Sequence, residues 1–270
     1  MILRQNGALQ YYTFESLADQ VPHGVFTRHG GYSQGAFASL NVGHTVGDDL
    51  EHVEANHEAI YRTLGTCAGS VVTAHQVHRD HVAVVSPDDG GKVYAEADAL
   101  ISNVPGLYLM LRFADCVPIC FYAPRQGAVG LAHAGWRGTL AKVAAKTAQA
   151  MMATFGCRPE EIHAGIGPSI GPCCFQVGPE VVEAFRQEFP GADALFSHHQ
   201  SDGKAHLDLW RANSLQLREV GLTSIEVAGL CTFCHRDTFY SHRAEQGHTG
   251  RFAAVIGLRA PAAFRDGKGV

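Results

Sequence analysis

The longest apolar stretch of the sequence constrains the fold most. Between Leu107 and Tyr122 only Arg112 and Asp115 are charged, and Pro118 interrupts the stretch. Continuous apolar runs of this kind are typical of strands buried on both faces, and proline breaks the hydrogen-bonded ladder of an interior strand. We therefore predict two buried strands, or one bent strand, with the sequence Ala-Asp-Cys at the break.

A second apolar run, at 128–134, leads directly into a segment with helical periodicity. The apolar positions of that segment keep the spacing of one helix face, at Leu140, Val143, Thr147, Met151 and Phe155. The sequence Gly-Trp-Arg-Gly lies between the two parts, and backbone N–H groups at the start of a helix attract anions. We predict a strand-loop-helix unit whose loop can bind an anion with the help of Arg137.

The remaining elements do not alternate regularly between strand and helix. Predicted helices cover 52–65, which ends at a glycine, 178–189, with Pro179 near its first turn, and 207–221, which also ends at a glycine. Predicted strands begin at 163, 224 and 252. No repeat or linker divides the chain, so we expect one domain over 1–270, with an α+β fold of layered, mixed β-sheets flanked by helices.

The composition excludes several classes of partner. The formal net charge is −5, which provides no general attraction for a nucleic acid or an anionic membrane surface. No secretory signal and no apolar run long enough to span a membrane is evident, so we expect a cytoplasmic, monomeric protein with reduced thiols. An anionic substrate would therefore have to be bound by local positive charge.

Three side chains stand out as candidate metal ligands, namely His78, Cys116 and His133. Each lies at or just beyond the end of an apolar run, where a buried strand meets a loop. A catalytic zinc site commonly takes three ligands from separate elements and leaves one position open, and two imidazoles with one thiolate suit it. The alternative is that these are ordinary buried side chains. Position and neighbours favour the metal site.

Other cysteines and histidines could compete with this set. Cys173 and Cys174 are adjacent, while the segment from Cys231 to His235 reads Cys-Thr-Phe-Cys-His and resembles half of a zinc ribbon. A structural metal site is one interpretation of these four thiols. Because adjacent cysteines rarely supply two ligands to one tetrahedral centre, we predict core thiols instead. We expect His75 and His81 to be surface or loop residues.

Four arginines lie in or next to glycine- or serine-bearing loops: Arg28, Arg137, Arg243 and Arg251. A planar guanidinium binds phosphate or carboxylate through paired hydrogen bonds. Since the protein as a whole is acidic, we expect one or two of these arginines to face the site.

Eight motifs together identify a family resemblance. In chain order they read TRHGGYSQGAFASLNVGHTVGDD, HQVH, ADAL, ADCVPI, HAGWRG, GPSIGPCCFQVG, CTFCHRDTFYSHR and TGRFAAVIGL. From about residue 24 to 258 the chain resembles the YfiH/laccase-domain family, also called the multicopper polyphenol oxidase-like or purine nucleoside phosphorylase family. One departure is Ala244, which stands where the family commonly has a second arginine.

The resemblance implies a layered fold related to the catalytic domain of cytotoxic necrotizing factor. It also implies a metal, usually zinc and in older assignments copper, bound by His78, Cys116 and His133. The implied activity is phosphorolysis of adenosine and inosine to the base and ribose 1-phosphate, with adenosine deamination and methylthioadenosine phosphorolysis in some members. We add Asn41 to Arg28, Arg137 and Arg243 as expected substrate- or phosphate-binding residues.

Several functional hypotheses follow from these residues. The first is metal-assisted chemistry on a purine nucleoside, with Asp115 as a proton shuttle or as a partner that orients a histidine. The second is a metal-free cysteine hydrolase or deamidase, with Cys116 as nucleophile and His133 or His78 as base. A copper phenol oxidase is disfavoured because the sequence contains no His-x-His pair. A non-enzymatic metal-storage or partner-binding module is the remaining alternative.

Overall fold

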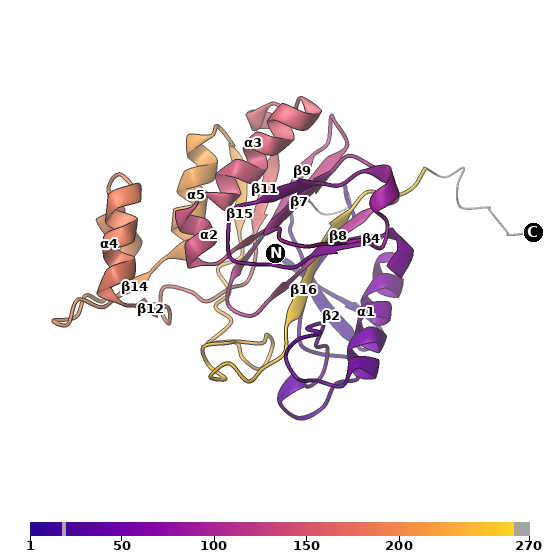
Figure 1. The fold of residues 1–270 in the computed structure, drawn as a ribbon, viewed down its shortest axis with the longest axis horizontal. Coiled ribbons are helices and arrows are strands. Elements are labelled where there is room, and N and C mark those ends of the chain that lie inside the picture. Colours follow the sequence, from indigo (N-terminus) through magenta and orange to yellow (C-terminus); the bar gives the residue numbers. More distant parts are fainter. Residues whose placement is uncertain (18–19, 262–270) are drawn as a thin grey trace, which may run out of the picture.

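The computed structural model describes residues 1–17 and 20–261 and arranges them in four layers, shown in Figure 1. Two large sheets pack face to face, helix α1 covers the outer face of one, and helices α3 and α5 cover the outer face of the other. Parallel and antiparallel pairs occur in both sheets. The predicted α+β class with layered, mixed sheets is therefore confirmed.

The first large sheet has seven strands in the order β1-β2-β3-β16-β8-β4-β6. Its strands are β1 (Ile2–Asn6), β2 (Leu9–Thr13), β3 (His23–Phe26), β16 (Phe252–Gly257), β8 (Tyr108–Phe113), β4 (Val71–Ala74) and β6 (Val93–Tyr94). The second has six strands in the order β15-β11-β9-β10-β7-β5. They are β15 (Ser224–Val227), β11 (His163–Ile166), β9 (Val117–Ala123), β10 (Ala128–Ala134), β7 (Ala99–Ser102) and β5 (Val82–Val84).

A small third sheet and the helices complete the described chain. The small sheet has the order β12-β14-β13, formed by β12 (Gln176–Val177), β14 (Ala205–Leu207) and β13 (Phe196–Ser197). The α-helices are α1 (Leu50–Leu64), α2 (Trp136–Leu140), α3 (Val143–Phe155), α4 (Pro179–Glu188) and α5 (Leu209–Glu219). Short 3-10 helices are η1 (Gly35–Phe37), η2 (Ala68–Ser70), η3 (Pro87–Asp89), η4 (Pro159–Glu161) and η5 (Ala192–Leu195). None of the described helices is both long and apolar enough to cross a membrane.

The alternating side chains of β8 explain why the two sheets stay together. Leu109, Leu111 and Phe113 point into the core between the sheets, whereas Tyr108 and Met110 pack towards α1. Burying one such side chain stabilises the fold by about 1.5–3 kcal/mol relative to leaving it exposed. The prediction of strands buried on both faces is confirmed for this stretch.

The break in the long apolar stretch lies earlier than the proline. The chain leaves the first sheet after Phe113 and enters the second at Val117, so Ala-Asp-Cys is the passage between the sheets. Pro118 lies inside β9, and β11 pairs with β9 only from Ile119 onward. On that side the Pro118 carbonyl oxygen accepts the N–H of Gly167, just beyond β11, and no strand residue lies opposite the missing N–H group of Pro118.

The predicted helix after β10 is two helices rather than one. Lys142 adopts a left-handed conformation, with φ of 65°, and separates α2 from α3. The short α2 is held against α5, where the side chains of Asn213 and Gln216 donate to the hydroxyl and carbonyl oxygens of Thr139. The apolar period continues across the break, so periodicity alone does not reveal it.

Helix α1 agrees with the prediction and begins two residues earlier than expected. The side chain of Asp49 accepts the N–H of Glu51 at the helix start, and Gly65 ends the helix with a φ of 71°. Within α1, His57 is buried and bonds the carbonyl oxygen of Val42 at 3.1 Å. Burial lowers the pKa of His57 to about 4, so this histidine is neutral at physiological pH.

The prediction that Cys173, Cys174, Cys231 and Cys234 are core thiols is wrong for three of them. Cys173 and Cys234 are exposed, Cys174 is half-buried, and Cys231 alone is buried. The loops that carry them follow β11 and β15 at the edge of the second sheet, where the core ends.

Candidate active site and metal centre

The candidate site lies where the chain passes between the two large sheets. Residues 75–81 connect β4 to β5, residues 95–98 connect β6 to β7, and residues 114–116 connect β8 to β9. All three connections run from the first sheet to the second. They carry His78, Asp98 and Cys116, and His133 lies near the end of the neighbouring strand β10.

The three predicted ligands converge where these connections pass between the two sheets. One ligand atom from each of His78, Cys116 and His133 lies within 4.8 Å of the others. The Cys116 sulfur is 4.0 Å from Nδ1 of His78, and the centroids of the two imidazole rings are 4.8 Å apart. The cysteine is half-buried and faces a cavity. Side chains far apart in the sequence therefore form one cluster with access from solvent.

Asp98 holds the cluster together, and sequence analysis did not single it out. Its carboxylate is fully buried and accepts the backbone N–H groups of Val77, His78 and Arg79 at 3.2, 3.0 and 2.8 Å. It also bonds Nδ1 of His133 at 2.8 Å. This bond fixes the ring and leaves Nε2 as the nitrogen available to Cys116 and to a metal ion.

The same contacts set the charges of the site. Burial raises the pKa of the Cys116 thiol, but the charge and hydrogen bond of His133, together with His78, lower it to about 6. Burial lowers the pKa of His133, but the Cys116 thiolate and Asp98 raise it to about 9. Burial likewise raises the pKa of Asp98, and the bonds from His133 and the backbone lower it. Cys116 is therefore a thiolate at neutral pH, the form that binds metals and acts as a nucleophile.

The backbone of the site fits a bound metal ion. His78 and Asp115 have positive φ angles of 58° and 82°, conformations that non-glycine residues adopt at some cost and that gather at functional sites. At Gly135, an added Cβ atom would lie 2.9 Å from the Cys116 sulfur and 3.0 Å from Nδ1 of His78. The residue that faces the ligands therefore has no side chain, and two imidazoles with a thiolate are a donor set that Zn²⁺ accepts.

Substituting this glycine tests whether the open space matters. Gly135 has φ of −69° and ψ of 174°, which alanine also adopts, so Gly135→Ala introduces no backbone strain. We expect the variant to fold but to bind Zn²⁺ about 10-fold more weakly or worse, because the methyl group displaces a ligand atom. Competition with a chromogenic chelator measures the affinity. Gly69→Ala is the control, since a Cβ there meets nothing within 4 Å, and equal affinity in both variants would contradict the expectation.

A cavity of about 590 Å³ opens over the cluster. This volume lies within the range of small-molecule sites. Four arginines line it, namely Arg112, Arg137, Arg243 and Arg251. Aromatic and imidazole side chains also line it: His44, His75, Trp136, Phe175 and His242. The wall thus combines positive charge with flat rings.

Several of these lining residues were not assigned to the site from the sequence, namely His44, His75, Arg112, Trp136, Phe175 and His242. For Arg112, the sequence does not show which way a lone arginine in an apolar strand points; its guanidinium donates to the Ala74 carbonyl oxygen. His75 lies in a loop and is exposed, as expected, but it also reaches the cavity. His81 is exposed in the same loop.

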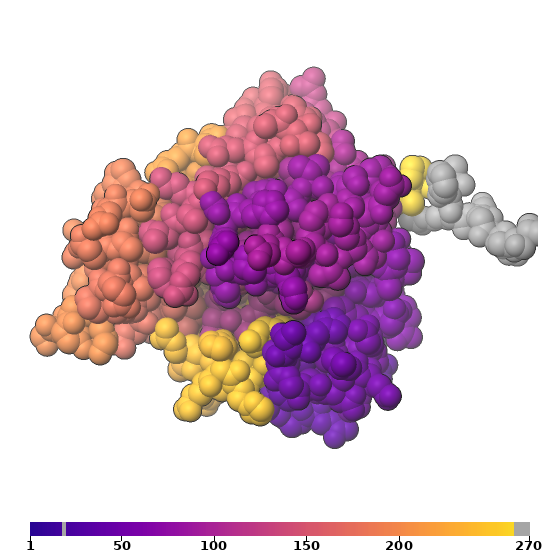
Figure 2. Space-filling model, in the orientation of Figure 1, coloured from indigo at the N-terminus to yellow at the C-terminus, as the bar shows by residue number. Residues whose placement is uncertain are grey.

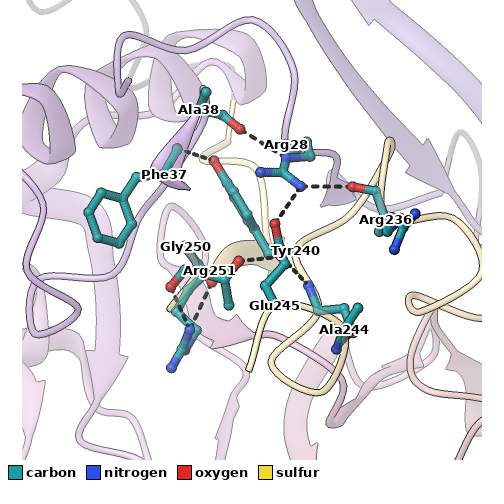
Figure 3. Close-up of polar contacts among 11 residues, drawn as sticks. Arg28, Phe37, Ala38, Arg236, Tyr240, Ala244, Glu245, Gly250 and Arg251 are labelled. Atoms are coloured by element: carbon teal, nitrogen blue, oxygen red, sulfur yellow. Dashed lines mark hydrogen bonds and ion pairs between the residues drawn. The ribbon is translucent and has the colours of Figure 1, made fainter. Parts of the chain in front are cut away.

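Arg28 lies outside the described wall of the cavity. It donates to the carbonyl oxygens of Ala38 and Arg236 and forms an ion pair with Glu245 at 3.0 Å, as Figure 3 shows. Its guanidinium also lies over the Tyr240 ring, 4.5 Å from the centroid. Figure 2 shows the yellow C-terminal segment against the indigo N-terminal one. The structure thus places Arg28 in a contact that joins these segments rather than in the expected substrate contact.

Asn41 is completely buried and is likewise absent from the described wall. Its side-chain nitrogen donates to Asp48, and its oxygen accepts the N–H groups of Gly43 and Arg251. The amide group is thus used within the protein, and a direct contact between Asn41 and substrate stays a prediction. Asn41 positions two residues that do line the cavity, Gly43 and Arg251.

Asp115 lines the cavity but does not orient a histidine. One carboxylate oxygen accepts the Thr232 hydroxyl at 2.7 Å, and the other accepts the backbone N–H of Arg243 at 2.6 Å. Of the two roles expected of Asp115, the orientation of a histidine belongs to Asp98, which bonds His133, and the role as a proton shuttle stays a prediction. Asp115 therefore joins the passage between the sheets to the loops that carry Thr232 and Arg243.

Comparisons with known proteins agree with this arrangement. The family model described as multi-copper polyphenol oxidoreductase laccase matches residues 22–259. The purine nucleoside phosphorylase YlmD of Geobacillus stearothermophilus is 41% identical over 245 residues, covering 87% of this chain and 89% of that protein. The purine nucleoside phosphorylase YfiH of Escherichia coli is 37% identical over 235 residues, covering 86% and 91%.

Solved structures show the same fold. The crystal structure of YlmD from Geobacillus stearothermophilus matches with a TM-score of 0.90 at 38% identity, covering 96% of this chain and 99% of that one. The crystal structure of the hypothetical protein YfiH of Bacillus licheniformis also has a TM-score of 0.90, at 35% identity, covering 95% and 99%. The chain therefore belongs to the multi-copper polyphenol oxidoreductase laccase family, together with the YfiH and YlmD proteins.

Proposed function

We propose that this chain is a metal-dependent purine nucleoside phosphorylase, which converts adenosine or inosine and phosphate to the base and ribose 1-phosphate. The observation that carries the proposal is the convergence of three ligand atoms beneath a cavity lined by four arginines and several flat rings. The relatives named purine nucleoside phosphorylase, at 37–41% identity, support the same reaction.

The metal would be held by His78, Cys116 and His133. Zn²⁺ is the ion we favour, with Cu²⁺ as the second candidate, because three ligands from separate elements with one open position are typical of catalytic zinc. When bound, Zn²⁺ supplies a Lewis acid that stabilises negative charge on an oxygen atom of a reactant. Asp98 orients His133 for this role through the bond at Nδ1.

The positively charged wall would hold the phosphate. In phosphorolysis a phosphate oxygen bonds to the ribose anomeric carbon, the bond from that carbon to the purine breaks, and the purine keeps the electron pair and takes a proton. Arg137 and Arg243 would fix and neutralise the phosphate. Rings such as those of Trp136 and Phe175 offer flat surfaces for the purine, and the imidazoles of His75 and His242 can supply the proton.

Product analysis tests the reaction. The purified chain is incubated with adenosine or inosine, with and without phosphate, and the products are separated by chromatography. We expect free base and ribose 1-phosphate only when phosphate is present. Formation of inosine from adenosine would add deamination, and methylthioadenosine tests a third substrate. No turnover of any nucleoside would contradict the proposal and favour a non-enzymatic module.

A substitution at Arg137 tests the phosphate contact. Because one hydrogen bond between charged groups contributes about 1.5–3 kcal/mol, Arg137→Met should raise KM for phosphate about 10- to 100-fold. KM for the nucleoside should change much less. Arg125→Met is the control, since Arg125 is a surface residue paired with Glu161. Equal increases in both KM values would show that Arg137 supports the pocket as a whole and would remove it from phosphate binding.

A metal-free cysteine hydrolase or deamidase is the second candidate function. The lowered pKa of Cys116 beside His133 favours it, because such a pair is an activated nucleophile. Exhaustive treatment with a chelator distinguishes the two candidates. Phosphorolysis that survives complete removal of metal would exclude the zinc mechanism, and activity that returns on adding Zn²⁺ would exclude the cysteine one.

A further inference from the structure

A second cluster of metal-binding side chains lies outside the ligand set described above. It consists of Cys173, Cys174, Cys231 and Cys234, and we refer to it as the four-cysteine cluster. All four sulfur atoms lie within 4.8 Å of one another. In the described part of the chain, this cluster and the His78–Cys116–His133 cluster are the two that bring together three or more such ligands.

The sheet brings the two cysteine-bearing loops together. Strands β11 and β15 are parallel, with Ile166 opposite Val227, and both chains continue beyond these strands side by side. Ser169 then bridges to Cys231, and its N–H donates to the Leu230 carbonyl oxygen. The loops that follow the two strands therefore meet at one place, which is why pairs of cysteines 60 residues apart approach closely.

The spacing of the sulfur atoms matches a single tetrahedral ion. A zinc–sulfur distance of about 2.3 Å implies about 3.8 Å between any two sulfurs of a tetrahedron. Cys234 lies 3.7 Å from the sulfur of Cys173 and 3.5 Å from that of Cys174. The adjacent residues Cys173 and Cys174 can both approach Cys234 because residues 172–174 form a turn. An iron–sulfur cluster with one cysteine on each of four iron atoms would need wider spacing.

The surroundings also distinguish the cluster from ordinary core thiols. Cys173 and Cys234 are exposed, so hydrophobic burial does not explain why four sulfurs gather here. The backbone N–H of Gly171 donates to the Cys231 sulfur at 3.2 Å, the type of bond that stabilises a thiolate ligand. Separations of 3.5–3.7 Å are well beyond the roughly 2.05 Å of a disulfide bond.

We propose that Cys173, Cys174, Cys231 and Cys234 form a closed structural site for one Zn²⁺ ion, distinct from the three-ligand site. The ion binds the four deprotonated sulfurs, and the thiol protons pass to solvent. Four protein ligands leave no open position, so the site does no chemistry on a substrate. Its role is to hold the two loops together. These loops carry Ile170 and Phe175 in the cavity wall and Thr232 on Asp115.

Metal stoichiometry tests the proposal directly. The full chain is purified under reducing conditions with Zn²⁺ supplied, desalted, and analysed for metal by mass spectrometry. We expect about two Zn²⁺ per chain for the parent, one for Cys234→Ser, one for Cys116→Ser and none for the double variant. Cys67→Ser is the matched control, since Cys67 is exposed and lies outside both clusters, and it should retain two. The readout does not depend on activity, so failure of the proposed function leaves it intact.

Two further measurements keep the proposal open to refutation if Cys234→Ser folds poorly. In the parent protein, a thiol reagent should modify Cys67 at once and the four clustered cysteines at least about 10-fold more slowly, until a strong chelator is added. The Tm should fall by about 5 °C or more on that treatment. One metal ion per chain, lost only in Cys116→Ser, would overturn the proposal. So would rapid modification of Cys234, or a disulfide found within the cluster in protein kept reduced and supplied with Zn²⁺.

Discussion

Cys116→Ser is expected to lower kcat/KM for phosphorolysis by about 10³-fold or more. The serine hydroxyl is a far weaker ligand than the Cys116 thiolate, so the metal ion and its stabilisation of transition-state charge are lost together. That stabilisation amounts to several kcal/mol, and about 4 kcal/mol corresponds to a thousandfold change in rate. Steady-state kinetics with inosine and phosphate measure the change.

The fold should survive this substitution. Cys116 lies in the passage between the sheets, is half-buried and borders the cavity, so its replacement removes little core packing. Circular dichroism and thermal unfolding check this, with Cys67→Ser as the matched control at an exposed position. A Cys116→Ser enzyme with more than a tenth of the parent activity would rule out both the zinc mechanism and the cysteine mechanism.

Asp98→Asn is expected to weaken Zn²⁺ binding by about 10- to 100-fold and to destabilise the metal-free protein by about 1–3 kcal/mol. The asparagine keeps the size of the side chain but replaces one acceptor oxygen with an N–H₂ group. Four donors now share one acceptor atom, so at least one buried N–H group loses its partner. His133 is then no longer held in one tautomer. Because residues that hydrogen-bond a metal-ligating histidine influence metal affinity, Zn²⁺ binding weakens.

Asp89→Asn separates the two effects. Asp89 is also buried, and its carboxylate accepts from Ser86, Lys92 and Tyr94, away from the candidate site. Both variants should lower the free energy of unfolding in urea. Only Asp98→Asn should change the affinity for Zn²⁺ in chelator competition. Equal affinities in the two variants would show that Asp98 is a structural residue without influence on the metal.

Much of the site could be predicted from the sequence because its ligands lie at strand ends. Apolar runs are visible in a sequence and indicate buried strands. Polar residues at the ends of neighbouring strands can then lie close together in space. His78, Cys116 and His133 were identified in this way. Asp98 has the same position, directly before β7, but its importance depends on three backbone N–H groups from another connection. Such long-range bonds leave no periodic signal.

Other features could not be predicted for different physical reasons. The break at Lys142 leaves the apolar period in phase, so the sequence indicated one helix where there are two. Arg28 and Asn41 are polar residues in glycine-rich loops, a pattern shared by substrate ligands and by residues that hold loops together. The four-cysteine cluster depends on the parallel pairing of β11 and β15, and pairing between distant strands is not encoded locally.

Three chain connections of the site run from one large sheet to the other, so the positions of the ligands depend on how tightly the two sheets pack. Because His78, Asp98 and Cys116 all lie on these connections, any loosening of the interior between the sheets would move the ligands apart. Binding of a metal ion at His78, Cys116 and His133 should therefore slow amide hydrogen exchange along β8 and β10 relative to the metal-free protein. The slowing should extend to residues that do not contact the ion. Conversely, a cavity-forming substitution such as Leu111→Ala should weaken ion binding without altering any ligand.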